Sequence, residues 1–203
     1  MEAAGCKAGD SVLDIGCGSG TDADHFSRLT RNVTGVDVAA DALAAFCARG
    51  YAPVLADAGK LPFPDGAFDY VVCPAVLHHL VGQGGLEKYL REFVRVLRPG
   101  GYVIALEPNI LHLSGLLMNI ANSISPGITG LVPHERALLP FHLKRVFSKA
   151  GLEPVHCAAA SYTWNRLPLW VSRFISRVEK PFRSLGPFRY LGWFTVVTGH
   201  KLR

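Results

Sequence analysis

The sequence predicts an α/β fold: a doubly wound sheet, mostly parallel with an antiparallel last strand, and helices on both faces. Apolar strand-like runs alternate with helix-like stretches through the first two thirds of the chain, and this alternation is typical of a parallel sheet covered on both sides. A glycine-rich turn, residues 16 to 20, directly follows the first apolar run. Such sheets bind their ligands at the carboxyl ends of the strands, where this turn would lie.

Each expected element follows from its local pattern. Strands are predicted at 11–15, 32–37, 52–56, 68–73 and 101–106, and helices at 20–30, 40–49, 86–97 and 140–150. The helix at 86–97 is the best marked, because its apolar residues fall on one face and Arg98-Pro99-Gly100-Gly101 ends it.

The last part of the chain follows a different pattern. Residues 108–139 are apolar but interrupted by proline and glycine, which indicates one or two short helices lying over the sheet as a lid. A basic helix at about 167–179 and a final strand at 193–198 are expected within a C-terminal region at about 166–203. Because no stretch resembles a linker, residues 1–203 are expected to form a single domain.

Composition narrows the class of protein. With 203 residues, of which 49% are hydrophobic and 18% charged, the chain can bury a substantial core and is not expected to be disordered. Its five cysteines show no CxxC spacing, so we expect reduced cysteines and no metal site. The start of the chain lacks the pattern of a secretion signal, and no run is long and apolar enough to span a bilayer. The expected location is therefore cytoplasmic.

The net charge of +5 is unevenly distributed. From Thr163 onward the chain has eight Lys and Arg residues and the single acid Glu179. In 166–183 the basic side chains fall near one face of the expected helix, and Trp170 and other apolar side chains supply its apolar surface. This is typical of a helix lying on an anionic membrane, and it equally fits a helix that covers the sheet and exposes a basic face. Peripheral membrane contact is therefore one expectation; no nucleic acid partner is expected, because no nucleic-acid-binding module surrounds these residues.

The glycine-rich turn leaves two kinds of nucleotide ligand open. From Gly18 the letters GSGTDA fit the dinucleotide fingerprint, and Asp37 follows at a suitable distance for a ribose hydroxyl, so an NAD(P)-dependent oxidoreductase is one interpretation. Asp14, two residues before the first glycine, disfavours it. At about 4 Å a carboxylate and a diphosphate charge would repel by roughly 4 kcal/mol near a protein surface. A ligand that carries positive charge would instead be favoured there.

Four segments together resemble a known family. They are VLDIGCGSG (12–20), GVDVA (35–39), LADAGKLPFPDGAFDYVVCPAVLHHL (55–80) and VLRPGGYVIALEPN (96–109). In order and spacing they are similar to the class I S-adenosylmethionine-dependent methyltransferases, in the small-molecule branch (type 11) that includes enzymes of ubiquinone and menaquinone biosynthesis. The resemblance covers about the first 110 residues. It implies a Rossmann-like fold, S-adenosyl-L-methionine as cofactor, and transfer of its methyl group to a small molecule.

The resemblance also implies cofactor contacts. The backbone of Gly16, Cys17 and Gly18 would pass beneath the methionine portion, and Asp14 would face its cationic end. Asp37, with Val38 beside it, would bind the ribose; Asp57 and Ala58 would bind the adenine; and the backbone carbonyl of Cys73 would receive the ammonium group. Cys17 and Cys73 are expected to be small buried residues rather than nucleophiles.

Three histidines are candidates for catalysis. His78 and His79 follow the fourth strand, near where the methyl group points in this family. One of them would act as a base or orient the acceptor, the alternative being that they only pack against the cofactor. His134, with Glu135 next to it, lies in the apolar insertion and forms a second candidate pair.

The acceptor and the closure of its pocket are the least determined features. The apolar insertion favours an apolar or amphipathic acceptor such as a quinone, lipid or natural product, unless its residues simply complete the core. Most relatives have helices before the first strand, which here begins about ten residues from Met1. This chain is therefore expected to close its site with 108–139, to borrow a partner chain as in a homodimer, or to be a shortened form. A cofactor-binding but inactive subunit is the alternative outside catalysis.

Overall fold

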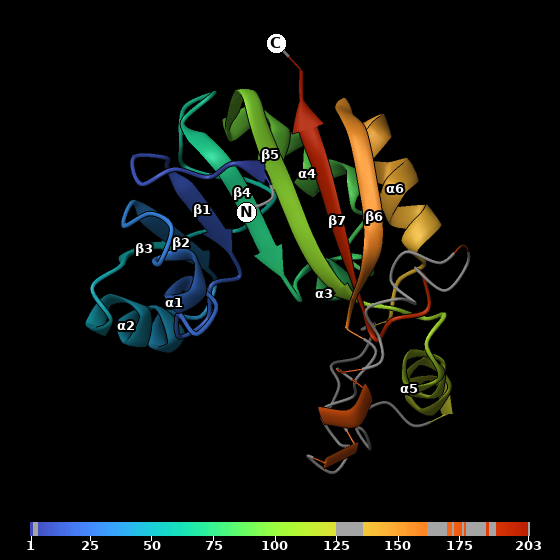
Figure 1. Cartoon of the computed structure of the whole chain (residues 1–203). Coiled ribbons are helices and arrows are strands. Elements are labelled where there is room, and N and C mark those ends of the chain that lie inside the picture. The colour runs from blue at the N-terminus through green and yellow to red at the C-terminus, as the bar shows by residue number, and fades with distance from the viewer. Residues whose placement is uncertain are drawn as a thin grey trace.

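Figure 1 shows the arrangement of the chain in a computed structural model, which describes residues 1, 4–124, 136–161, 170, 171, 173–175, 177, 186 and 190–202. The strands in this part of the chain are β1 (Val12–Ile15), β2 (Val33–Asp37), β3 (Ala52–Leu55), β4 (Phe68–Pro74), β5 (Leu97–Pro108), β6 (Leu152–Ser161) and β7 (Phe194–Lys201). The helices are α1 (Ala23–Phe26), α2 (Ala40–Ala48), α3 (Leu77–Leu80), α4 (Glu87–Val96), α5 (Leu113–Ile124) and α6 (Pro140–Lys149). The described residues between 170 and 177 are also helical.

The strands form one sheet in the order β3-β2-β1-β4-β5-β7-β6. β1 pairs in parallel with both β2 and β4, and β7 runs antiparallel between β5 and β6. The predicted fold class is confirmed, including the antiparallel last strand. Because the chain winds outward in both directions from β1 and β4, the expected position of a ligand crevice is at the carboxyl ends of these two strands.

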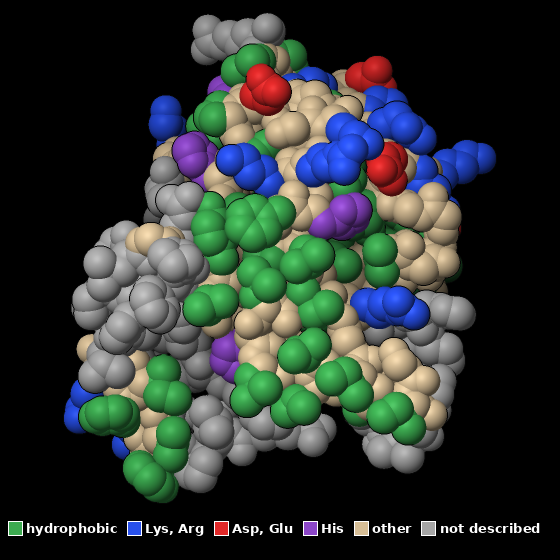
Figure 2. Space-filling view, turned by 90° about the vertical axis from the view of Figure 1, so that its right-hand side faces the viewer, with side chains coloured by type: hydrophobic (Ala, Val, Ile, Leu, Met, Phe, Trp, Pro, Cys, Tyr) green, Lys and Arg blue, Asp and Glu red, His purple; other side chains and the backbone are tan. Residues whose placement is uncertain are grey.

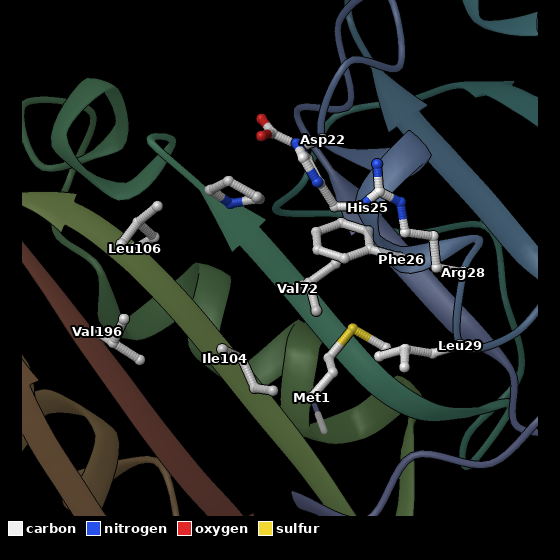
Figure 3. A pocket seen from close by; sticks show the side chains of 11 residues that line it. Met1, Asp22, His25, Phe26, Arg28, Leu29, Val72, Ile104, Leu106 and Val196 are labelled. Atoms are coloured by element: carbon white, nitrogen blue, oxygen red, sulfur yellow. The ribbon is translucent and has the colours of Figure 1, made fainter. Parts of the chain in front are cut away.

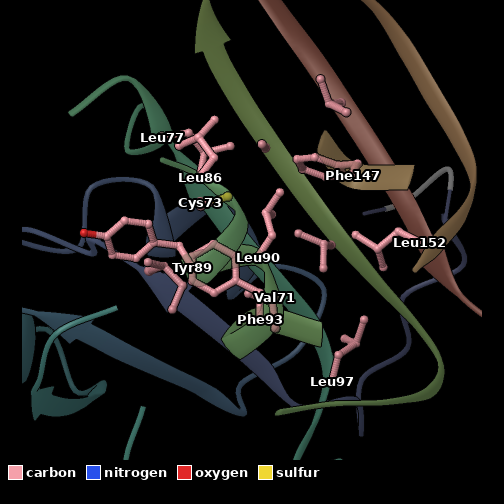
Figure 4. Packing of buried hydrophobic residues seen from close by; sticks show 14 of the residues in the cluster. Val71, Cys73, Leu77, Leu86, Tyr89, Leu90, Phe93, Leu97, Phe147 and Leu152 are labelled. Atoms are coloured by element: carbon pink, nitrogen blue, oxygen red, sulfur yellow. The ribbon is translucent and has the colours of Figure 1, made fainter. Parts of the chain in front are cut away.

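Helices pack on both faces of the sheet (Figure 1). On one face, α4 packs Tyr89, Leu90 and Phe93 against Val71 of β4, and Phe147 of α6 joins the same cluster (Figure 4). All of these side chains are buried. The predicted one-sided apolar pattern of α4 is thus the face that this core uses.

The opposite face has a smaller cluster, which includes Phe46 of α2, Val12 of β1 and Tyr70 of β4. Gly35 of β2 allows α2 to approach the sheet closely, because a Cβ atom on it would lie 2.3 Å from Cζ of Phe46. This packing fixes the carboxyl end of β2 relative to β1.

Two elements differ from the sequence-based expectation. The helix expected at 20–30 is only the short α1. Beyond it, the Thr30 hydroxyl lies within hydrogen-bond distance of the carbonyls of Ala8 and Asp10, which ties the chain to the segment before β1. β6 was not predicted. Its sequence contains Pro154 and three consecutive alanines, which have low strand propensity, but proline is tolerated in a strand at the edge of a sheet. Among the described helices, none has the length and apolar composition needed to cross a bilayer.

Candidate active site

The turn after β1 depends on glycine. Gly16, Gly18 and Gly20 have φ angles of 65°, 50° and 88°, in the left-handed region. At Gly16 a Cβ atom would also lie 2.6 Å from Cγ2 of Val76. These positions therefore favour glycine, and Gly16, at the start of the turn, is exposed at the carboxyl edge of the sheet.

Asp37 connects this turn to β2. Its Oδ2 accepts a hydrogen bond from the Gly18 amide at 2.9 Å, and its Oδ1 accepts one from the Ala39 amide at 2.9 Å. Each carboxylate oxygen has lone pairs left for a further donor. Val38 is exposed next to it. The expected ribose-binding acid is thus held in place at the edge where the ligand crevice lies.

Asp14 is the most unusual group of the site. Its side chain is fully buried in β1, and neither carboxyl oxygen has a hydrogen-bond partner in the described part of the chain. Burial, and then the charges of Asp22 and Asp37, raise the pKa of this carboxyl well above its usual value. A buried carboxylate without a partner is costly, and a positive charge placed beside it would remove much of that cost. The residue therefore fits a cationic ligand, as its position in the sequence predicted.

Asp57 lies along the same edge, because β3 pairs with β2 in parallel and Leu55 stands opposite Asp37. Asp57 is exposed, and its Oδ1 accepts a hydrogen bond from the Gly59 amide at 2.6 Å, which shapes the turn. Ala58 is half-buried. The structure thus brings Asp14, the glycine turn, Asp37 and Asp57 to one edge; their contacts with a cofactor stay predictions.

The two cysteines of the site are buried. Burial and the nearby carboxylates raise the pKa of the Cys17 thiol to about 12 and that of Cys73 well above its usual range. Since the thiolate is the nucleophilic form, both residues are protonated near neutral pH. This agrees with the interpretation that they fill space.

His78 is held by an acid that sequence reasoning missed. Its Nδ1 lies 2.8 Å from Oε2 of Glu107, and both side chains are buried. Glu107, at the carboxyl end of β5, also accepts hydrogen bonds from the amides of Val76, Leu77 and His78 at 3.0, 2.7 and 3.2 Å. A carboxylate on Nδ1 of a neutral histidine leaves Nε2 as the proton acceptor. The signal in the sequence was a single acid within the apolar run of the fifth strand.

The other candidate histidines differ from His78. His79 is exposed, and its ring centroid lies 4.0 Å from that of His78. His134 and Glu135 lie outside the described residues. Among the residues that the structure describes, no group of three or more His, Cys, Asp or Glu side chains could hold a metal ion.

A pocket of about 580 Å³ adjoins the site (Figure 3). Val72, Ile104, Leu106 and Val196 of β4, β5 and β7 supply an apolar floor, and residues of and around α1 supply the other wall. That wall includes Asp22, His25 and Arg28. Two residues that line the pocket connect it to the site. The charge of Asp22 raises the pKa of Asp14, and Pro74 directly follows Cys73.

Comparison with known proteins gives matches along most of the chain. A family model described as a methyltransferase domain matches residues 13–105. A probable S-adenosylmethionine-dependent methyltransferase of Mycolicibacterium smegmatis is 36% identical over 151 residues, which cover 72% of this chain and 53% of that protein. The ubiquinone/menaquinone biosynthesis C-methyltransferase of Pseudomonas putida is 39% identical over 119 residues, 53% of this chain and 45% of that protein. A fatty-acid O-methyltransferase of M. smegmatis is 40% identical over 103 residues, 47% of this chain and 36% of that protein.

The chain spans about half the length of the first two of these relatives, and less of the third. Solved structures of similar fold include S-adenosylmethionine-dependent methyltransferases from Thermotoga maritima and Archaeoglobus fulgidus. The first has a TM-score of 0.72 and 20% identity and covers 95% of this chain and 82% of its own. The second has a TM-score of 0.66 and 22% identity and covers 97% and 87%. At these identities the likeness concerns the fold.

Proposed function

We propose that this chain is a class I S-adenosylmethionine-dependent methyltransferase, which binds S-adenosylmethionine and methylates a small apolar or amphipathic acceptor. The methyltransferase-domain match over residues 13–105 and the similarity to the relative from M. smegmatis support the proposal. When bound, this cofactor supplies a methyl group on a positively charged sulfonium. The residues of the chain must then bind the cofactor, align the acceptor and exclude water, all of which contribute strongly to such a transfer.

The observation that carries the proposal is Asp14. Its buried carboxyl has no partner within the described chain, and S-adenosylmethionine has two cationic groups, a sulfonium and an ammonium, and no phosphate. A dinucleotide would bring negative charge to the same turn and increase the cost of burying Asp14. The unpartnered acid therefore supports the sulfonium cofactor over NAD(P).

The remaining residues would each contact a different part of the cofactor. The glycine turn offers backbone to the methionine portion, and Asp37 keeps lone pairs for the ribose hydroxyls while its bonds to Gly18 and Ala39 hold it still. Val38 follows β2, and Asp57 and Ala58 follow β3; these residues would lie towards the adenine, and the backbone carbonyl of Cys73 would receive the ammonium group. This division follows the order of the strands in the sheet.

His78 is the residue that we assign as the general base when the acceptor is a hydroxyl or an acidic carbon. Glu107 is its positioning residue, because its carboxylate holds Nδ1 and directs Nε2 to take the proton. Glu107 also fixes the preceding turn through Val76 and Leu77, so the imidazole has little freedom to move.

The pocket beside the site supports an apolar acceptor. Its sheet side offers only Val, Ile, Leu and Pro side chains, while His25, Arg28 and Asp22 stand at the opposite wall. This suits a molecule with an apolar body and a polar group. A relative named for ubiquinone and menaquinone biosynthesis and another named as a fatty-acid methyltransferase are consistent with acceptors of that kind.

Calorimetric titration with S-adenosylmethionine, its demethylated product and NADH tests the cofactor. We expect the first two to bind and NADH not to. Asp14→Asn and Asp37→Ala should each weaken binding at least about tenfold, or 1.4 kcal/mol. Asp65→Asn is the matched control, since it removes an exposed carboxylate paired with Arg95. Binding of NADH alone would contradict the proposal.

Steady-state kinetics with the best acceptor from a screen of phenols, quinones and fatty acids tests the base. His78→Ala should lower kcat about 10²- to 10⁴-fold, whereas His79→Ala, at the exposed neighbour, should change it little. Glu107→Gln should lower kcat and move the pH profile while leaving cofactor affinity within about twofold. Equal losses in the two histidine variants would refute the assignment, and cofactor binding without any turnover would indicate an inactive subunit.

A further inference from the structure

Helix α5 exposes its apolar side chains, contrary to the usual pattern of a surface helix. Its apolar side chains point to solvent: Leu113 and Ile124 are 68% and 79% exposed, and the helix also exposes Leu116, Leu117 and Ile120. Of its polar side chains, Ser114 and Asn122 are buried, Asn119 is half-buried and Ser123 is exposed. The exposed apolar side chains are spaced three or four residues apart, so they share one face of the helix. A helix in a water-soluble protein has the reverse arrangement, so this face is built to meet something other than water.

Specific contacts fix this orientation. The Asn119 side chain both donates to the Ala137 carbonyl at 3.3 Å and accepts from the Ala137 amide at 2.8 Å. At Gly115 the helix lies close to the backbone of Asn109, because a Cβ atom built at Gly115 would be 2.0 Å from the Asn109 carbonyl oxygen. α5 could therefore turn its leucines inward only by breaking these contacts.

A second helical segment combines apolar and basic side chains. Trp170 and Phe174 are 75% and 63% exposed, and Arg173 and Arg177 are exposed between and after them. Since residues three or four apart share a face of a helix, these four side chains lie on one face. Val171 and Ile175 are half-buried on the other. An exposed tryptophan next to arginines is typical of a segment at a membrane interface.

Both segments lie beyond the carboxyl edge of the sheet, on the side of the methyltransferase site (Figure 1). Seen from the side of β6 and α6, hydrophobic side chains gather over the middle and lower part of the molecule, and Lys and Arg over the upper part (Figure 2). Residues 109–124 contain no Asp, Glu, Lys or Arg, and the exposed Arg136 precedes Ala137, the residue bonded to α5.

We propose that α5 and residues 170–177 form a docking surface for a lipid bilayer with anionic headgroups. Leu113, Leu116, Leu117, Ile120, Ile124, Trp170 and Phe174 would enter the boundary of the acyl chains, and Arg136, Arg173 and Arg177 would meet the phosphates. The basic rim and the absence of acidic residues from 109–124 favour an anionic lipid surface over a second copy of this chain, because two like-charged rims repel. The inference extends the expected role of 166–183 to α5 and needs no methyl transfer to hold.

Co-sedimentation with phosphatidylcholine vesicles, with and without phosphatidylglycerol, measures the docking. We expect the full chain to pellet with the anionic vesicles. Leu113→Ser/Leu117→Ser/Ile120→Ser should lower its partition coefficient at least about tenfold. Arg173→Glu/Arg177→Glu should lower it by more than about tenfold on anionic vesicles only, since each basic residue near such a surface contributes roughly fivefold.

Two matched controls test whether the loss of any exposed leucine, or the same change of charge elsewhere on the protein, also lowers the partition coefficient. Leu202→Ser removes a leucine 57% exposed at the opposite edge of the sheet, for comparison with Leu117→Ser alone. Lys88→Glu/Arg91→Glu makes the same change of charge on the exposed side of α4. Neither should change the partition by more than about twofold. All variants should bind S-adenosylmethionine as the unmodified chain does, so a loss of docking is distinct from a failure of the cofactor proposal.

Three results would overturn the inference. The first is an unmodified chain that stays in the supernatant with anionic vesicles. The second is partition that the serine variant leaves unchanged, which would mean non-specific attraction by the basic residues. The third is a dimer in sedimentation velocity, without vesicles, that the serine variant dissociates, because the apolar face of α5 would then belong to a second copy of this chain.

Discussion

At the scale of single residues, the burial of Asp14 without a partner in the described chain should make stability depend on pH. Its folded-state pKa is raised above its unfolded value, so the fold prefers the protonated form. The stabilisation that comes from this proton is fully present below the unfolded pKa of about 3.9 and is lost as the pH rises through the folded pKa. In the ligand-free chain, the contribution of Asp14 to stability should therefore fall as the pH rises above about 4.

Asp14→Asn removes this dependence. We expect the variant to be more stable than the unmodified chain near pH 8, by about 1–3 kcal/mol, with the difference shrinking towards pH 4. Thermal unfolding of both proteins without ligand, from pH 4 to pH 8, measures it. Asp65→Asn, which removes an exposed carboxylate, is the control for the loss of one negative charge. A constant difference for Asp14→Asn would show that Asp14 is not strained by its burial.

The sequence revealed only some of these residues. Asp14 and Asp37 could be predicted because each lies at or next to the carboxyl end of a parallel strand, and these strand ends meet at one edge. Glu107 could not be predicted in this way. Its partners, His78 and the amides of Val76 and Leu77, lie about thirty residues away and come together only when β4 and β5 pair.

At the scale of elements, the approach of α2 to β2 positions the edge of the sheet that carries Asp37. Gly35→Ala would place a Cβ atom 2.3 Å from Cζ of Phe46 and 2.6 Å from Sγ of Cys17, and α2 or the glycine turn would have to move. We expect a loss of about 1–3 kcal/mol in the free energy of unfolding, measured by urea denaturation, together with weaker cofactor binding because Asp37 lies two residues away.

Gly9→Ala is the control for this change. No atom lies within 4 Å of a Cβ built at Gly9, so its effect should stay within about 0.5 kcal/mol. Similar losses for the two variants would mean that crowding at Gly35 is not the cause.

Periodicity predicted elements well where one face is buried. α4 and α6 begin and end within a residue or two of the expected positions, because their apolar stripes face the core. β6 escaped prediction because neither periodicity nor propensity marks it. It is a strand only because β7 pairs with it along its length, a contact about forty residues distant in the sequence.

At the scale of the whole molecule, the last strand completes the sheet. β7 lies between β5 and β6, so β6 is joined to the rest of the sheet only through the end of the chain. Lys201 connects this strand to the end of α4. Its Nζ donates hydrogen bonds to the carbonyls of Val94, in the last turn of α4, and of Leu97, the residue after the helix, at 2.7 and 2.6 Å. The last carbonyls of a helix have no partner within the helix and carry partial negative charge, so a cation suits this position.

Lys201→Met should therefore destabilise the fold by about 1.5–3 kcal/mol, the range for hydrogen bonds to a charged donor, since methionine keeps most of the apolar stem and loses the ammonium group. Urea denaturation measures this loss. Lys144→Met, at an exposed position of α6, should change stability by less than about 0.5 kcal/mol. If the two variants were equally stable, packing of β7 alone would join the end of the chain to the core, and the contact with α4 would be incidental.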